Sequence, residues 1–164
     1  MSYTEATEKY LAVRQDLTAA RALNLNTRQM QWIVAGARQN MRGISTKLTG
    51  TLLDDEGRPP YQVVGVDWNE PDLEIDHAIP LNMIHDRILG LDNYPVALDQ
   101  QGIVQLLLGQ FLCVLLRREQ HRQLRGNSMP PVPPVNRRWD WGDDPFARYN
   151  EAGLEVLGPP TRFA

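Results

Sequence analysis

Cysteine is nearly absent from this sequence, since Cys113 is the only one among 164 residues. A lone thiol excludes an internal disulfide and any zinc site built on several cysteines. It also favours a reducing compartment, so we expect a cytoplasmic protein. The first residues show no basic stretch followed by an apolar run, and we therefore expect no secretory signal.

Long hydrophobic runs are missing as well. The most apolar stretch, residues 103–116, is interrupted by Gln105, Gly109 and Gln110. A membrane-spanning helix needs about 20 mostly apolar residues, so we expect no membrane span. The 42% of apolar residues is enough for a packed core and argues against a wholly disordered chain.

Positive charge is in short supply, with 17 Lys and Arg against 20 Asp and Glu and a net charge of −3. Phosphate neutralisation needs clustered cations, so this balance disfavours nonspecific nucleic-acid binding. One compact basic block remains, and it is either a phosphate-binding surface or the solvated end of a helix favoured by the helix dipole. Its members are Arg117, Arg118, His121, Arg122 and Arg125. On the first alternative, the four arginines bind nucleic acid.

Two amphipathic helices are predicted at the start of the chain. Residues 2–24 repeat apolar side chains at helical spacing after candidate N-caps at Ser2 and Thr4. A second helix is expected from residue 26 or 27 to Gly43, where a C-terminal stop is typical. The short link between them predicts an antiparallel pair that serves in packing or partner binding.

The middle of the chain predicts two strands. Residues 46–60 are polar and contain Gly and Pro, which is typical of a connector. Residues 61–66 have the β-branched content of a strand, and residues 73–77 alternate apolar and polar side chains. A turn over residues 67–72 would let the two strands pair as a hairpin. Residues 79–89 then predict a loop that leads into a short helix.

Residues 100–125 predict one long helix, apolar on nearly every face in its middle, which we expect to be buried in the core. Cys113 inside it is most simply a small buried hydrophobe. Beyond Gly126, the prolines of residues 129–135 favour an extended polyproline conformation. The rest of the tail is rich in aromatics and packs either on its own domain or on a protein partner. These aromatics are Trp139, Trp141, Phe146 and Tyr149.

The residues best suited to metal binding and proton transfer are Asp76 and His77, which lie side by side at the end of the second predicted strand. A carboxylate is a hard ligand for a divalent ion, and an imidazole can take a proton from water near neutral pH. His121 can complete a metal shell, whereas His85 is more typical of a surface residue. A metal that stabilises charge and a base that generates the nucleophile are the parts that phosphodiester hydrolysis needs.

Three runs carry a family resemblance: residues 61–66, residues 72–81 with the string Asp-His-Ala-Ile-Pro-Leu, and residues 115–123 with Leu-Leu-Arg-Arg-Glu-Gln-His. They resemble the first strand, the Asp-His-x-Ile-Pro-Leu signature and the closing helix of the HNH nucleases, the ββα-metal family. The resemblance implies that Asp76 and His121 bind a metal ion and that His77 is the general base. It also implies that Arg118 or Arg122 contacts the scissile phosphate.

The sequence departs from the pattern of the HNH family in two features. The positions of the Cys-x-x-Cys knuckles found in many members hold Val63, Val66, Arg117 and Gln120 here, so no structural zinc is expected.

The asparagine in the middle of the motif is the second departure, because Leu112 falls at its spacing in compact members. Asn93 is the better candidate, since it opens a possible second strand within residues 91–98. In that role Asn93 would orient His77 through its side-chain carbonyl, and a long helical insertion would separate it from His121.

The predicted fold is therefore α+β, with a helical hairpin over residues 1–45, a ββα-metal core over residues 60–126 and an extended tail over residues 127–164. The predicted function is that of a metal-dependent endonuclease acting on DNA, with Mg²⁺ expected and Mn²⁺, Ni²⁺ or Zn²⁺ as alternatives. A protein partner could bind the tail or the N-terminal helices. The competing class is a non-catalytic assembly or interaction module on a degenerate HNH scaffold.

Overall fold

The computed structural model describes residues 1–134 and 136–158, and the chain folds into two compact units. The first unit consists of Met1–Thr51 and Leu81–Gly109. The second consists of Leu52–Pro80 and the described residues from Gln110 on. The chain therefore leaves the second unit after Pro80, builds two helices of the first unit and returns at Gln110.

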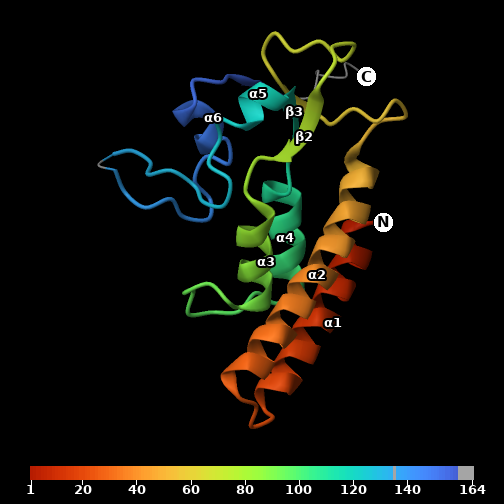
Figure 1. Cartoon of the computed structure of the whole chain (residues 1–164), viewed down its shortest axis with the longest axis vertical. Helices are drawn as coiled ribbons and strands as arrows, with labels where there is room; N and C mark the ends of the chain where they lie inside the picture. The colour runs from red at the N-terminus through yellow and green to blue at the C-terminus, as the bar shows by residue number, and fades with distance from the viewer. Residues whose placement is uncertain (135, 159–164) are drawn as a thin grey trace. The chain divides into compact units, whose positions relative to one another are not determined.

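The first unit begins with the helices α1 (Tyr3–Arg21) and α2 (Thr27–Leu52), which run antiparallel in Figure 1. Ser2 and Asn26 cap them, because each side-chain oxygen accepts a hydrogen bond from the backbone N–H three residues later, at 3.1 and 3.0 Å. The predicted helical pair and both of its starting points are confirmed.

The predicted end of the second helix at Gly43 is wrong. The helix continues to Leu52, and Ala37, Met41, Ser45 and Leu48 form its buried face. A Cβ added at Gly43 would meet nothing within 4 Å apart from the backbone of the helix itself. The apolar repeat on the buried face outweighs the lower helix propensity of a single glycine.

A buried polar chain joins α1 and α2 to the helix α3 (Leu81–Leu89), the short helix that the sequence predicts. The Tyr10 hydroxyl lies 2.8 Å from Ser45 Oγ, which lies 2.7 Å from His85 Nε2. Burial raises the pKa of Tyr10 to about 12. His85 is only 2% exposed, so its prediction as a surface residue is wrong.

The single helix predicted over residues 100–125 is in fact three elements. The helix α4 (Gln100–Gln110) belongs to the first unit, and the strand β3 (Cys113–Arg117) and the short helix α5 (Arg118–His121) belong to the second. Residues 113–116 of β3 are all buried, which explains why their apolar run resembles the inside of a helix.

The second unit contains a four-stranded mixed sheet in the order β2-β3-β1-β4. The strand β2 (Leu73–His77) pairs antiparallel with β3, while β1 (Tyr61–Val63) pairs parallel with β3 and antiparallel with β4 (Val156–Leu157). The predicted hairpin between residues 61–66 and 73–77 is therefore wrong, because β3 lies between those two strands.

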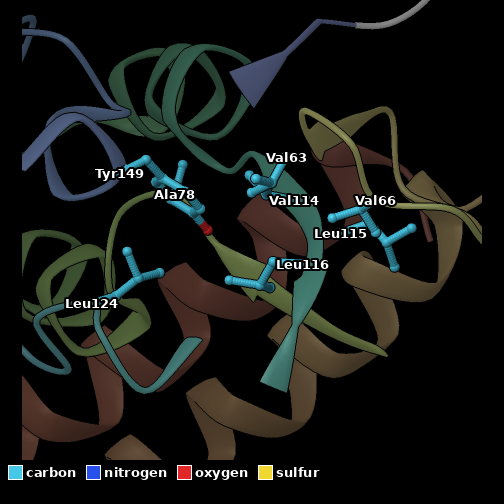
Figure 2. Close-up of a cluster of buried hydrophobic side chains, with 8 residues drawn as sticks. All are labelled: Val63, Val66, Ala78, Val114, Leu115, Leu116, Leu124 and Tyr149. Carbon is cyan, nitrogen blue, oxygen red and sulfur yellow. The ribbon is translucent and has the colours of Figure 1, made fainter. Parts of the chain in front are cut away.

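The core of the second unit is built around β3 (Figure 2). Val114, Leu115 and Leu116 are each at most 2% exposed although neighbouring residues of a strand point to opposite faces, so both faces of β3 are covered. The other members of the cluster are Val63, Val66, Ala78, Leu124 and Tyr149. Tyr149 comes from the helix α6 (Ala147–Glu151) near the C-terminus.

The C-terminal tail folds onto its own unit over the residues that the structure describes. The strand β4 joins the sheet beside β1, and Phe146 packs with Tyr149 against the core cluster. The predicted irregular tail thus contains a helix and a strand. The predicted polyproline stretch includes Val135, which lies outside the described residues, as do residues 159–164.

The structure confirms an α+β fold with an N-terminal helical pair and a mixed sheet. Over residues 1–134 and 136–158, none of the helices combines the length and the apolar character that a membrane crossing needs.

Candidate functional site

The candidate site lies on β2 and α5 of the second unit. Glu74 and Asp76 are two residues apart on β2, so both side chains point to the same face of the sheet. The chain turns into α5 directly after β3, the antiparallel neighbour of β2, and this places His121 over that face. Both carboxylates contact the His121 imidazole.

The His121 ring has one carboxylate at each nitrogen. Its Nδ1 lies 2.5 Å from Glu74 Oε2, and its Nε2 lies 3.4 Å from Asp76 Oδ1. The first distance is a short hydrogen bond, whereas the second is longer than an ordinary N–H···O bond. The two nitrogens therefore have different environments.

The hydrogen bond to Glu74 fixes which nitrogen of His121 carries a proton. Hydrogen bonds from His121 and then Arg118 lower the pKa of Glu74, so its carboxylate is ionised and can only accept. His121 Nδ1 consequently donates to Glu74. The other nitrogen, Nε2, faces Asp76.

The separation between Asp76 Oδ1 and His121 Nε2 fits two ligands of one divalent ion. Donor atoms with bonds of about 2.0–2.2 Å and angles between octahedral and tetrahedral lie about 2.8–3.6 Å apart. The observed 3.4 Å falls in this range. Within the described parts of the chain, no cluster of three or more His, Cys, Asp or Glu side chains is arranged for a metal ion, so the pair offers two protein ligands.

The second oxygen of Asp76 is held by two donors from α6. Arg148 Nη2 donates to Asp76 Oδ2 at 2.6 Å, and the Tyr149 hydroxyl donates to the same oxygen at 2.7 Å. Burial and the adjacent Asp76 carboxylate raise the pKa of Tyr149, so the phenol keeps its proton. Asp76 thus has one oxygen tied to α6 and one facing His121.

His77 follows Asp76 and is the last residue of β2. Its ring meets Phe111 edge-on at 4.9 Å between centroids. Desolvation lowers the pKa of His77 to about 4, against the opposing effect of the Asp76 charge. The imidazole is therefore neutral at pH 7.

The other two candidates from the central region belong to the first unit. Asn93 is exposed in the loop between α3 and α4, and the strand that it was predicted to open does not form. Its assignment as the residue that orients His77 stays a prediction. His85 is part of the buried chain with Ser45 and Tyr10.

Three of the four arginines of the basic block form ion pairs with acids of the same unit. The pairs are Arg117–Glu70 at 2.5 Å, Arg118–Glu74 at 2.8 Å and Arg125–Glu151 at 2.6 Å. Arg122 is exposed, and its side chain has no ion pair or hydrogen bond among the residues that the structure describes. A paired arginine must leave or share its carboxylate before it binds a phosphate.

Sequence reasoning missed three residues of the site: Glu74, Arg148 and Tyr149. The period of two along β2 could have identified Glu74, since it shares a face with Asp76. No sequence signal identifies Arg148 and Tyr149, because they reach Asp76 across more than 70 residues of chain.

Comparison with models of known protein families, with curated proteins and with solved structures finds no match for this chain.

Proposed function

We propose that the chain is a metal-dependent endonuclease of the HNH type that hydrolyses DNA phosphodiester bonds. Asp76 and His121 would hold the divalent ion, and His77 would be the general base. The observation that carries the proposal is the 3.4 Å separation of Asp76 Oδ1 and His121 Nε2, two residues that lie 45 positions apart in the sequence.

The order of elements around the pair supports this assignment. β2 ends in Asp76 and His77, β3 pairs antiparallel with it, and α5 follows at once with His121 as its last residue. Two antiparallel strands and a helix in this order are what a ββα-metal core requires. The stretch that includes α3 and α4 would then be an insertion between the two strands.

The surroundings of His121 and Asp76 suit metal ligands. A histidine ligand usually donates its second ring N–H to a carboxylate, and Glu74 accepts such a bond from His121 Nδ1. A bound divalent ion would stabilise the negative charge that develops on the phosphate during hydrolysis. Two protein ligands suit Mg²⁺, which keeps water and substrate oxygens in its shell, and Mn²⁺, Ni²⁺ or Zn²⁺ remain alternatives.

His77 would take the proton from the attacking water. It is the one histidine of the second unit besides His121, because the third, His85, lies in the first unit. Its imidazole is neutral at pH 7 and therefore in the state that a general base needs.

Arg122, which is exposed and unpaired among the described residues, is the best placed arginine of the basic block to contact a phosphate. The single cysteine suits a reducing compartment such as the cytoplasm.

Cleavage of supercoiled plasmid tests the proposal. We expect the wild type to nick the plasmid with Mg²⁺ or Mn²⁺ and to lose this activity with a chelator. His77→Ala should reduce the rate by about 100-fold or more, the usual contribution of a general base. Asp76→Asn should weaken activation by the ion, because it removes a charged ligand.

The matched control for Asp76→Asn is Asp16→Asn, the same chemical change at an exposed position of α1. It should leave cleavage unchanged. Undiminished cleavage by His77→Ala would contradict the base assignment. A wild type that cleaves with no divalent ion, or cleaves equally well in chelator, would contradict the proposed function.

The second candidate, a non-catalytic interaction module on a degenerate HNH scaffold, is favoured by the ion pairs of the basic block. Arg117, Arg118 and Arg125 each have a carboxylate partner within 2.8 Å, which reduces the positive charge offered to DNA. This candidate predicts no binding of Mn²⁺ in a calorimetric titration and a stable complex of fixed stoichiometry with a protein partner.

A further inference from the structure

We propose that Arg148 and Tyr149 are positioning residues that present Asp76 Oδ1 to the metal ion and to His121. The inference rests on the proposed function, because it assigns a role to Asp76 as a metal ligand. It concerns two residues of α6 that no motif in the sequence connects with the site.

The two donors occupy the same oxygen of Asp76. Arg148 Nη2 and the Tyr149 hydroxyl reach Oδ2 at 2.6 and 2.7 Å, and His121 Nε2 is 3.4 Å from Oδ1. Rotation of the carboxylate about its Cβ–Cγ bond would break both bonds to Oδ2. The pair of donors therefore selects one orientation of the carboxylate, with Oδ1 toward His121.

Arg148 is itself fixed in place by backbone carbonyls. Its Nε donates to Ala78 O at 3.2 Å, and its other nitrogens donate to the carbonyls of His77 and Arg125. The guanidinium is 1% exposed, so water does not compete for these bonds. A planar group with this many partners has no alternative rotamer that keeps them, and Asp76 is held against a rigid donor.

The arrangement also gives Asp76 a cationic partner without occupying the oxygen that faces His121. Asp76 is only 13% exposed, and a carboxylate at such a position is costly unless it is paired. Arg148 supplies that pairing at Oδ2. Because Oδ1 makes no hydrogen bond of ordinary length to His121, it remains able to bind a cation.

Substitution Tyr149→Phe separates positioning from packing. The change removes one donor to Asp76 Oδ2 and keeps the ring that packs in the core cluster. We expect Mn²⁺ affinity, measured by calorimetry on the full chain, to fall about 10-fold to 100-fold, as for other residues that orient metal ligands. The stoichiometry of one ion and the circular dichroism spectrum should not change.

The matched control is Tyr61→Phe. Tyr61 packs against the same cluster, with its ring 5.2 Å from that of Phe146, and has no hydrogen bond to Asp76. This variant should bind Mn²⁺ as tightly as the wild type. A crystal structure of Tyr149→Phe should show the Asp76 carboxylate rotated, with Oδ1 farther than 3.4 Å from His121 Nε2.

The possible outcomes distinguish this inference from the proposed function. If the wild type binds one Mn²⁺ and Tyr149→Phe binds it equally tightly, positioning by Tyr149 is overturned and the proposed function stands. A wild-type structure with Mn²⁺ in which Oδ2 is the ligand, with Arg148 displaced from it, would also overturn the inference. A wild type that binds no divalent ion overturns both proposals.

Discussion

Asp76 is the residue on which the polar interactions of the second unit converge. Its carboxylate contacts His121 of α5 through one oxygen and two donors of α6 through the other. Burying a carboxylate is unfavourable, and Arg148 offsets that cost with a charge that is itself almost fully buried. The stability of the unit and the geometry of the candidate site therefore depend on the same pair.

Arg148→Met should strongly destabilise the second unit. The substitution keeps a long apolar side chain but leaves Asp76 without its cation, and breaking a buried pair from one side costs about 3–5 kcal/mol. Urea unfolding followed by tryptophan fluorescence measures the loss, since Trp68, Trp139 and Trp141 all belong to this unit.

Arg122→Met is the control for that experiment, because it makes the same change at an exposed arginine that has no ion pair among the described residues. Its unfolding free energy should differ from the wild type by less than about 0.5 kcal/mol. Equal losses in the two variants would contradict the role of Arg148 as the partner of a buried charge.

Sequence reasoning proposed the candidate-site residues that a short motif contains and missed those that only the fold brings together. Asp76 and His77 stand in one string, and His121 follows from the closing motif of the same resemblance. Arg148 and Tyr149 could not be predicted, since a lone arginine beside aromatics is typical of many exposed tails. Their contacts with Asp76 depend on where the chain returns after α5.

At the scale of elements, β3 explains the largest error of the sequence-based prediction. A strand with neighbours on both edges and covered faces has no polar side, so its residues show neither the period of a helix nor that of a half-exposed strand. Residues 113–116 are all buried for this reason. The apolar run could not be distinguished from the continuation of α4, and the hairpin was consequently assigned to the wrong partner strands.

A substitution at Gly43 tests whether α2 continues past this residue. If the helix continues to Leu52, Gly43→Ala should stabilise the chain by about 0.5–1 kcal/mol, because alanine loses less backbone entropy in a helix interior. A Cβ at this position meets nothing within 4 Å. The midpoint of urea unfolding, followed by the helical signal in circular dichroism, measures the gain.

Gly57→Ala is the matched control for a glycine outside a helix. Gly57 has a φ of +81°, a region that alanine disfavours by about 1–2 kcal/mol, so this variant should be destabilised. A loss of stability in Gly43→Ala would indicate that the helix ends near residue 43, as the sequence alone predicts.

At the scale of the whole molecule, the two units differ in how pH affects them. Four acids have pKa values lowered by hydrogen bonds within the second unit, and they are Glu70, Glu74, Asp143 and Glu151. Burial raises the pKa of a tyrosine in each unit, Tyr10 in the first and Tyr149 in the second. Acid should therefore weaken the second unit, whereas strong alkali should weaken both.

Glu70 is the acid for which the pH range of the stability effect is most clearly defined. Its hydrogen bonds with Arg117 lower its pKa from the usual 4.5 to about 2, so its contribution is fully present above pH 4.5 and is lost as the pH falls toward 2. We expect Glu70→Gln to be less stable than the wild type at pH 7 and to approach it at pH 2. Urea unfolding at both pH values, followed by tryptophan fluorescence, checks this.

The control for the acid window is Glu8→Gln, which removes an exposed carboxylate from α1 of the first unit. It should keep the same difference from the wild type at both pH values. A Glu70→Gln variant whose deficit does not shrink between pH 4.5 and 2 would contradict the assigned ion pair with Arg117.

We propose that Asp76 and His121 share one divalent ion. The most direct test is a crystal of the wild-type chain soaked in Mn²⁺ and measured for anomalous scattering. If the two residues share an ion, one strong peak should lie within about 2.0–2.3 Å of both Asp76 Oδ1 and His121 Nε2. A soaked crystal with no peak between these two atoms, or with Mn²⁺ bound only elsewhere on the chain, would contradict it.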